Sequence, residues 1–357
     1  MLVAFSLALL ITLFKPSVAQ AGSPSNAHDS ERILPSYPTS PNPSTPTAVL
    51  GWLTISSTDT KKAARFFQNM LGMVRVADLR VRLPKGNSLL LPTTHSVRMV
   101  LLNMPGSDVA GIRLVEVNSP GRELIRKGAR PGDYGFFDIG FLAEDTASIH
   151  DRFVAAGYNC KDVVEYPVPP LAPLVIHESL CEGPDGILVV FLQRNPPTEN
   201  LHGLHGSLHS ARVVPDADRS SAFFREALGF EFRGEFLYDN DAVRYIVDLP
   251  QKGKLRILSI QGAHATGGRL LLFELFDDSG RKMVGKDLKD RETPDHAGLY
   301  LWSFMVADLA RTVRDSVARG ATLICKPRRY GFPPYNGRLA ATVQAPDGAR
   351  LELVEAP

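Results

Sequence analysis

The chain has 357 residues, of which 44% are hydrophobic and 22% are charged. These fractions are typical of a folded globular protein, and the length suits two domains of ordinary size. Lys and Arg number 40 against 38 Asp and Glu, which gives a formal net charge of +2. This balance argues against the strongly basic surface that attracts nucleic acid, so we expect no nucleic-acid partner.

The first residues form an apolar segment. Residues 2–14 carry no charge, and residues 19–21 read Ala-Gln-Ala, a small-x-small pattern typical of a cleavage site. The run is shorter than the roughly 20 residues that a bilayer span needs. We therefore predict a signal peptide over residues 1–21, export to the periplasm or out of the cell, and no stable membrane span. Because no Lys or Arg precedes the run, an uncleaved N-terminal membrane anchor is the alternative.

The next segment, residues 22–47, is rich in Pro, Ser, Thr and Asn and has no apolar periodicity. Such a segment cannot bury enough surface to offset the entropy lost on ordering. We predict a disordered linker there.

Past residue 48, one order of elements occurs four times: a strand, a helix and three further strands. The helices have apolar residues at helical spacing, and Gly72 stops the first of them. FFQNMLG at 66–72 recurs as FFREALG at 223–229, and GPDG at 183–186 recurs as APDG at 345–348. The distance along the chain between the two copies of each phrase is nearly the same, which indicates a duplication. We predict two domains, residues 48–196 from copies one and two, and residues 203–357 from copies three and four.

The helix phrase D-x-x-x-x-x-x-F-F-x-x-x-L-G and the phrase PDG-x-x-x-E-L resemble the vicinal oxygen chelate superfamily over residues 48–356. This superfamily includes glyoxalase I, extradiol dioxygenases and bleomycin-resistance proteins. The resemblance implies an α+β fold in which four tandem βαβββ modules pair into two cupped, incomplete barrels. It also implies metal ligands on the first and last strands of the modules.

The resemblance places a first-strand ligand fourteen residues before the first aromatic residue of the helix phrase. Counting back from Phe223 gives His209, and the last-strand positions of copies three and four hold Glu274 and Glu352. The implied metal site is therefore His209, Glu274 and Glu352, and either glutamate could also serve as a catalytic base. One nitrogen and two oxygen donors suit Mn, Fe(II), Ni or Zn.

Each of these residues also has a structural interpretation. His209 could be a hydrogen-bonded core histidine, and the two glutamates could be inherited residues whose charges Arg or Tyr satisfy. In the first half, Trp52 and Val190 occupy ligand positions that they cannot fill. Glu116 and Asp138 are too few for a metal, so a structural cup or a metal-free pocket is expected there.

The loop KPRRYGFPPYNGR at 326–338 could reach over the opening of the cup in the second half. Tyr330 is its best pocket candidate, because Tyr166 holds the same place in the other half, and we assign Tyr330 a catalytic role. Cys160 and Cys181 are symmetric about a predicted turn, so an exported protein could oxidise them to a disulfide.

Two functions remain open. The first is a metal-dependent lyase, isomerase or dioxygenase that acts on a small oxygenated substrate through the C-terminal half. Leu301 stands where the dioxygenases have a second His, a departure from their pattern. The second is a metal-free protein of the bleomycin-resistance type that binds a small molecule. Association into a homodimer stays open.

Overall fold

The computed structural model describes residues 48–91, 94–107, 110–117, 121–168, 173–197, 204–262 and 267–356. The predicted signal peptide (1–21) and linker (22–47) lie outside the described residues. The rest forms four βαβββ modules, as predicted from the sequence.

The modules follow one another along the chain. Module 1 comprises β1 (Val49–Ser56), α1 (Thr60–Leu71), β2 (Val74–Leu83), β3 (His95–Asn103) and β4 (Gly111–Val117). Module 2 comprises β5 (Gly135–Ala143), α2 (Thr146–Ala155), β6 (Val164–Pro167), β7 (Val175–Glu182), the short 3-10 helix η1 (Pro184–Gly186) and β8 (Leu188–Asn195). Module 3 comprises β9 (Leu204–Val213), α3 (Ala217–Leu228), β10 (Phe230–Tyr238), α4 (Asp241–Ile246), β11 (Lys254–Gly262) and β12 (Arg269–Phe276). Module 4 comprises β13 (Gly298–Val306), α5 (Leu309–Ala318), β14 (Thr322–Arg329), β15 (Leu339–Gln344) and β16 (Arg350–Glu355).

The first helix of every module begins in the same way. An aspartate in extended conformation precedes each helix and accepts a hydrogen bond from a backbone N–H of its first turn; these are Asp59, Asp145, Asp216 and Asp308. Such a cap satisfies one of the helix's free donors and stabilises it by about 1 kcal/mol. None of the helices in the described part of the chain is long and apolar enough to cross a membrane.

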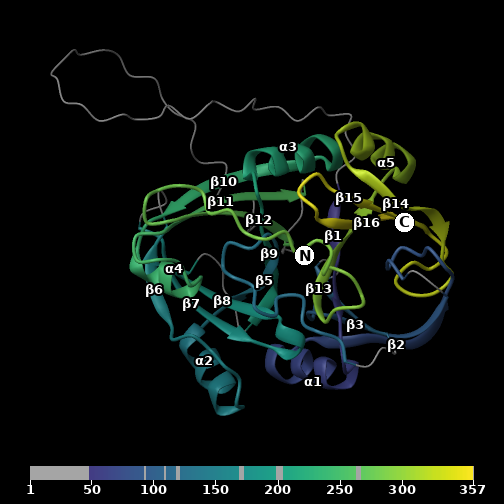
Figure 1. The fold of residues 1–357 in the computed structure, drawn as a ribbon. Coiled ribbons are helices and arrows are strands. Elements are labelled where there is room, and N and C mark those ends of the chain that lie inside the picture. The colour runs from purple at the N-terminus through teal and green to yellow at the C-terminus, as the bar shows by residue number, and fades with distance from the viewer. Residues whose placement is uncertain are drawn as a thin grey trace, which may run out of the picture. The chain divides into compact units, whose positions relative to one another are not determined.

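The sixteen strands of the described residues form two curled sheets of eight (Figure 1). Sheet 1 has the order β14-β15-β16-β13-β1-β4-β3-β2, and sheet 2 has the order β10-β11-β12-β9-β5-β8-β7-β6. Module 1 therefore shares a sheet with module 4, and module 2 shares a sheet with module 3. We predicted that modules 1 and 2 would pair within 48–196 and modules 3 and 4 within 203–357, and the sheet order differs from that prediction.

The lengths of the connections account for this pairing. β8 runs parallel to β5, and β9 runs antiparallel to it on the other side. The end of β8 and the start of β9 are therefore about 10 Å apart, two strand spacings, and residues 196–203 are long enough to join them. Because short connections usually join neighbouring strands, module 3 continues the sheet of module 2. Module 4 then adds its β13 to β1.

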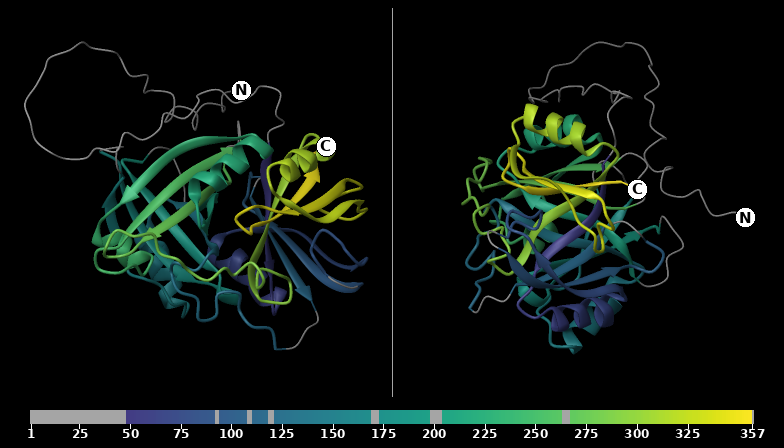
Figure 2. Two further views of the ribbon diagram at one scale, coloured as in Figure 1. Left: turned by 45° about the horizontal axis from the view of Figure 1, so that its top comes forward. Right: turned by 90° about the vertical axis from the view of Figure 1, so that its right-hand side faces the viewer.

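The main core lies between the two sheets and under the helices. One cluster of buried side chains includes Leu53 of β1, Phe141 of β5, Phe224 of α3 and Trp302 of β13. The indole N–H of Trp302 donates to Ser210 Oγ at 3.0 Å, which joins the two sheets directly. Each sheet also has a separate apolar cluster on its concave face. The two curled sheets, one blue and yellow and one teal and green, are seen next to each other in Figure 2.

Candidate functional site

Glu352 lies on the concave face of sheet 1, where it forms an ion pair. Its Oε2 is 2.8 Å from Arg113 Nη2, and both side chains are fully buried. The hydroxyls of Ser303 and Tyr335 donate to the same carboxylate at 2.5 and 2.8 Å. Burial acts to raise the pKa of Glu352, but Arg113 and these hydrogen bonds outweigh it and hold that pKa below its ordinary value. The carboxylate thus has a guanidinium from module 1 as its cationic partner.

A cluster of hydrogen-bonded side chains packs on the concave face of sheet 1. The Ser88 backbone N–H donates to the Tyr330 hydroxyl at 3.0 Å, and the Ser88 hydroxyl lies 3.1 Å from that of Tyr335. Thr342 Oγ1 donates to the Ser88 carbonyl at 2.7 Å. Tyr330, for which we predicted a catalytic role, is only 4% exposed and packs in this closed cluster.

Glu274 lies on the opposite, helix-covered face of sheet 2. Its Oε1 accepts the Ala217 N–H at the start of α3 at 3.0 Å, and Arg256 and Lys282 bind the carboxylate at 2.9 and 2.5 Å. Glu116 of module 1 has the same role, since it accepts the N–H and hydroxyl of Thr60 at the start of α1. These glutamates stabilise helix N-termini and do not face a cup.

His209 lies on the concave face of sheet 2, on β9. Gly140 of the neighbouring β5 makes room for it, because a Cβ at Gly140 would lie 2.0 Å from His209 Cε1. In the register of the sheet, Arg269 of the neighbouring strand β12 lies opposite His209. Glu274 is five residues further along β12, roughly 16 Å away at strand spacing, and points to the other face.

The structure therefore does not bring His209, Glu274 and Glu352 together. Glu352 belongs to the other sheet, and Glu274 is turned away from the cup that holds His209. Across the described residues, no group of three or more His, Cys, Asp or Glu side chains is arranged to hold a metal ion. The three-ligand site expected from the sequence is not formed.

Instead, two other ionisable side chains meet His209 on the concave face of sheet 2. Asp138 of β5 lies beside His209, with Oδ1 3.3 Å from Nε2. Glu178 of β7 is close enough to both for their charges to act on it. Asp138 and His209 are 4% and 5% exposed and Glu178 is 9% exposed, so all three are largely withdrawn from water.

A β-bulge directs Asp138 into this face. The pairing of β5 with β9 skips between Phe136 and Ile139, and both of these residues face the main core although they are three positions apart. The extra residue in β5 allows both Phe137 and Asp138 to lie on the concave side. Asp138 Oδ1 is close to His209 but not aligned with it, and makes no hydrogen bond to the described residues.

Glu178 is the most perturbed carboxyl group of this face. Burial raises its pKa to about 7, although the hydrogen bond from Tyr166 and the charge of His209 act in the opposite direction. The Tyr166 hydroxyl donates to Glu178 Oε2, and the Tyr238 ring packs edge-on against Tyr166 with centroids 5.5 Å apart. Burial also raises the pKa of both tyrosines. At neutral pH the carboxyl group is present in both its charged and its neutral form.

Our sequence reasoning found part of this group. It assigned His209 and Asp138 to first-strand positions, but in separate cups, and it matched Tyr166 with Tyr330. It missed Glu178. The available signal was the alternation in VIHESLCE, which places Glu178 on the same face as Ile176 and Leu180 in a half-buried strand.

A pocket of about 300 Å³ lies at one end of this concave face. Phe137, Leu180, Leu188 and Ile246 supply its apolar walls, and Arg126 is one of its polar residues. A narrower pocket shares Arg126, Phe137 and Leu188 with it and reaches Asp138. The space is thus adjacent to the ionisable group.

A disulfide supports one wall of this pocket. Cys160 and Cys181 are bonded to each other, as the sequence had suggested for an exported protein. Their neighbours Asn159, Lys161 and Glu182 line the pocket. The bridge therefore holds the end of β7, which contributes Glu182 to the pocket lining.

The comparisons with known proteins agree with this architecture. Residues 206–353 match the family model described as the Glyoxalase/Bleomycin resistance protein/Dioxygenase superfamily. Glyoxalase I from Zea mays is structurally similar, with a TM-score of 0.56 and 14% identity over 87% of this chain and 93% of that chain. A putative dioxygenase from Bacillus subtilis subsp. subtilis str. 168 gives a TM-score of 0.54 and 11% identity over 88% and 87%. At these identities the structural likeness shows the fold alone. No curated protein matches the sequence.

Proposed function

We propose that this chain, a member of the glyoxalase/bleomycin resistance/dioxygenase superfamily, is an enzyme that moves a proton on a small organic substrate. Its active site is the concave face of sheet 2, built from modules 2 and 3 rather than from the C-terminal half. The observation that carries the proposal is the buried group of Asp138, Glu178 and His209. Burying three ionisable side chains costs stability, and such groups are common where proton transfer takes place.

Glu178 is the residue that exchanges the proton. Its carboxylate takes a proton from a carbon next to a carbonyl group, and the electron pair of the broken C–H bond moves onto the carbonyl oxygen as an enolate. The carboxyl group exchanges this proton with water and then gives a proton back to the same carbon, while the electron pair returns from the enolate oxygen to form the new C–H bond. A pKa of about 7 suits both steps. Tyr166 holds the carboxyl group in place through its hydrogen bond.

The divalent metal that we predicted, Mn, Fe(II), Ni or Zn, does not fit the donor atoms of the described residues. Asp138 and His209 supply two donors, while Glu178 is held by Tyr166 and the remaining predicted ligands lie elsewhere. Three protein ligands are the usual minimum for a catalytic metal. The proposed reaction therefore has no step through a metal.

Proton exchange tests the proposal with a panel of compounds in place of the natural substrate. The full chain is incubated in D₂O with small aldehydes, ketones, oxo acids and esters, and loss of C–H signal is followed by proton NMR. We expect exchange next to a carbonyl with at least one compound, and its loss in Glu178→Gln. Glu165→Gln, at an exposed carboxylate of the neighbouring β6, is the matched control and should exchange like the wild type. Equal exchange in all three proteins would refute the proposal.

A second function uses the same face without turnover. The pocket of about 300 Å³ beside the ionisable group favours a binding protein for small molecules. Saturable binding of a panel compound, combined with no exchange on any member of the panel, would select this function over the first.

We also propose that the protein is exported. The apolar segment at residues 2–14 supports this, and so does the Cys160–Cys181 bridge, because disulfides persist mainly in oxidising compartments. Intact-mass measurement on protein from the cell exterior or periplasm is expected to give a chain without residues 1–21. Recovery of the full chain in the membrane fraction would favour the anchored alternative.

A further inference from the structure

Arg126 is half-buried, and it differs from the two fully buried arginines of the described residues. Arg113 and Arg212 each face a carboxylate, Glu352 at 2.8 Å and Glu292 at 2.7 Å. In the described part of the chain, no carboxylate lies within ion-pair distance of Arg126. Within the described residues, its guanidinium donates only to backbone carbonyls, those of Phe136 and Arg130, both at 3.2 Å.

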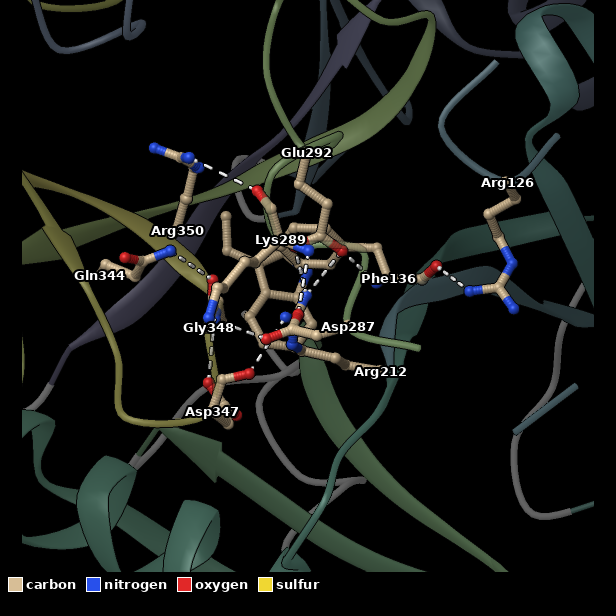
Figure 3. A network of polar contacts seen from close by, with 12 residues as sticks. Arg126, Phe136, Arg212, Asp287, Lys289, Glu292, Gln344, Asp347, Gly348 and Arg350 are labelled. Carbon is tan, nitrogen blue, oxygen red and sulfur yellow. Dashed lines mark hydrogen bonds and ion pairs between the residues drawn. The ribbon is translucent and has the colours of Figure 1, made fainter. Parts of the chain in front are cut away.

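The guanidinium is nevertheless held firmly in position. It lies over the ring of Phe137, 5.3 Å from the centroid. Figure 3 shows Arg126 approaching the Phe136 carbonyl from the side away from Arg212 and Glu292. Burial lowers the pKa of Arg126, because the protein withdraws this cation from water without giving it an adjacent counterion. A fixed, partly desolvated cation of this kind is suited to binding an anion.

Arg126 borders the pocket described above, and Arg130 lies beside it on the same rim. Lys161 also lines the pocket, but it is already paired with Asp248 at 2.6 Å. Glu182 is the remaining acid of the lining and is exposed. Once the Lys161–Asp248 pair is set aside, the pocket has an excess of positive charge above apolar walls.

The pocket leads toward the proposed catalytic group. Leu180 of its wall is the next inward-facing residue after Glu178 on β7, about 7 Å along the strand. Phe137 adjoins Asp138, which lines the narrower neighbouring pocket. An anionic group at Arg126 would therefore leave the apolar part of a ligand lying over Phe137 and Leu180, directed toward Glu178.

We propose that this pocket binds a small organic carboxylate with an apolar body, and that Arg126 takes the carboxylate. This inference rests on the proposed function, because it names the substrate class of the same site. The anionic head binds the guanidinium, the apolar body fills the 300 Å³ pocket, and Glu178 faces the other end of the molecule. Arg130 adds positive charge at the rim.

Calorimetry on the full chain tests this with two matched pairs of probes, phenylacetate with phenylacetamide and hexanoate with hexanamide. We expect an acid to bind about 10- to 100-fold more tightly than its amide, as a charge-assisted hydrogen bond in a partly buried site would give. Arg126→Gln should remove this preference. Lys127→Gln, the next residue but exposed and paired with Glu123, is the control and should keep it.

The opposite results would overturn the inference. These are equal affinity for acid and amide, no binding of either acid, or an unchanged preference in Arg126→Gln. The test is separable from that of the proposed function, because it measures the binding of acids and amides and does not depend on proton exchange. Proton exchange on neutral carbonyl compounds without acid binding would remove this inference alone. Acid binding at Arg126 without exchange on any compound would remove the proposed reaction alone.

Discussion

The His209 imidazole and the Asp138 carboxylate meet on the concave face of sheet 2, with Nε2 3.3 Å from Oδ1. They come from different modules, and they meet because β9 of module 3 pairs with β5 of module 2. The same pairing leaves module 1 with module 4, where the Arg113–Glu352 ion pair fills the other concave face. The two concave faces therefore differ among the described residues: that of sheet 1 holds the Arg113–Glu352 ion pair, and that of sheet 2 has a pocket at one end.

Gly140→Ala tests the placement of His209. The added methyl would lie 2.0 Å from the imidazole, so the ring must leave its position beside Asp138. We expect a loss of stability of about 1 to 3 kcal/mol in denaturant unfolding, together with loss of proton exchange. Gly331→Ala is the control, because its Cβ would meet nothing within 4 Å and should have little effect. An unchanged Gly140→Ala protein would show that the ring lies elsewhere.

The raised pKa of Glu178 makes stability depend on pH. Between the ordinary carboxyl value of 4.5 and about 7, the folded protein binds this proton more tightly than the unfolded chain does. Its contribution to stability is present below pH 4.5 and is lost as pH rises through about 7. Denaturant unfolding at pH 5 and pH 8 should show a drop of at most about 3 kcal/mol in the wild type that is absent in Glu178→Gln. The same pH dependence in both proteins would contradict the assignment.

The Arg113–Glu352 pair is predicted to be structural. Glu352→Gln or Arg113→Met alone should lower stability by about 3 to 5 kcal/mol, because each leaves a buried charge without its partner. The double variant Arg113→Met/Glu352→Gln should recover much of that loss, since it leaves neither charge. Urea unfolding of the three variants measures this coupling. Additive losses in the double variant would show that the two residues do not act as a pair.

The Cys160–Cys181 bridge should stabilise the fold. It closes a loop with a sequence separation of 21, so its removal in Cys160→Ala/Cys181→Ala should cost about 3 kcal/mol. Reductant should lower the free energy of unfolding of the wild type to that of this variant. Cys325→Ala, at the free and buried cysteine, should respond to reductant like the wild type. A wild type that is insensitive to reductant while unfolding would argue against the bridge.

The modules and their helices could be predicted from the sequence because their signals are local, such as the aspartate caps and the repeated FF-x-x-x-LG phrase. The pairing of modules could not, because each module presents a similar edge strand and only the connection lengths favour one partner. The sequence also did not show which face of sheet 2 Glu274 points to. LLLFELF is apolar on both faces, so strand alternation did not reveal which face is concave. Glu352 was expected to point inward and does, but its partner Arg113 comes from the other end of the chain.

Comparing Glu178→Gln with Glu352→Gln in the proton-exchange assay tests the location of the site most directly. Rates are expressed per folded molecule, so that the instability of Glu352→Gln does not enter. We predict a loss of about 100-fold or more in Glu178→Gln, the range expected for removing a general base, and a near wild-type rate in Glu352→Gln. Loss of exchange in Glu352→Gln with a normal rate in Glu178→Gln would place the chemistry in the other sheet and contradict the account.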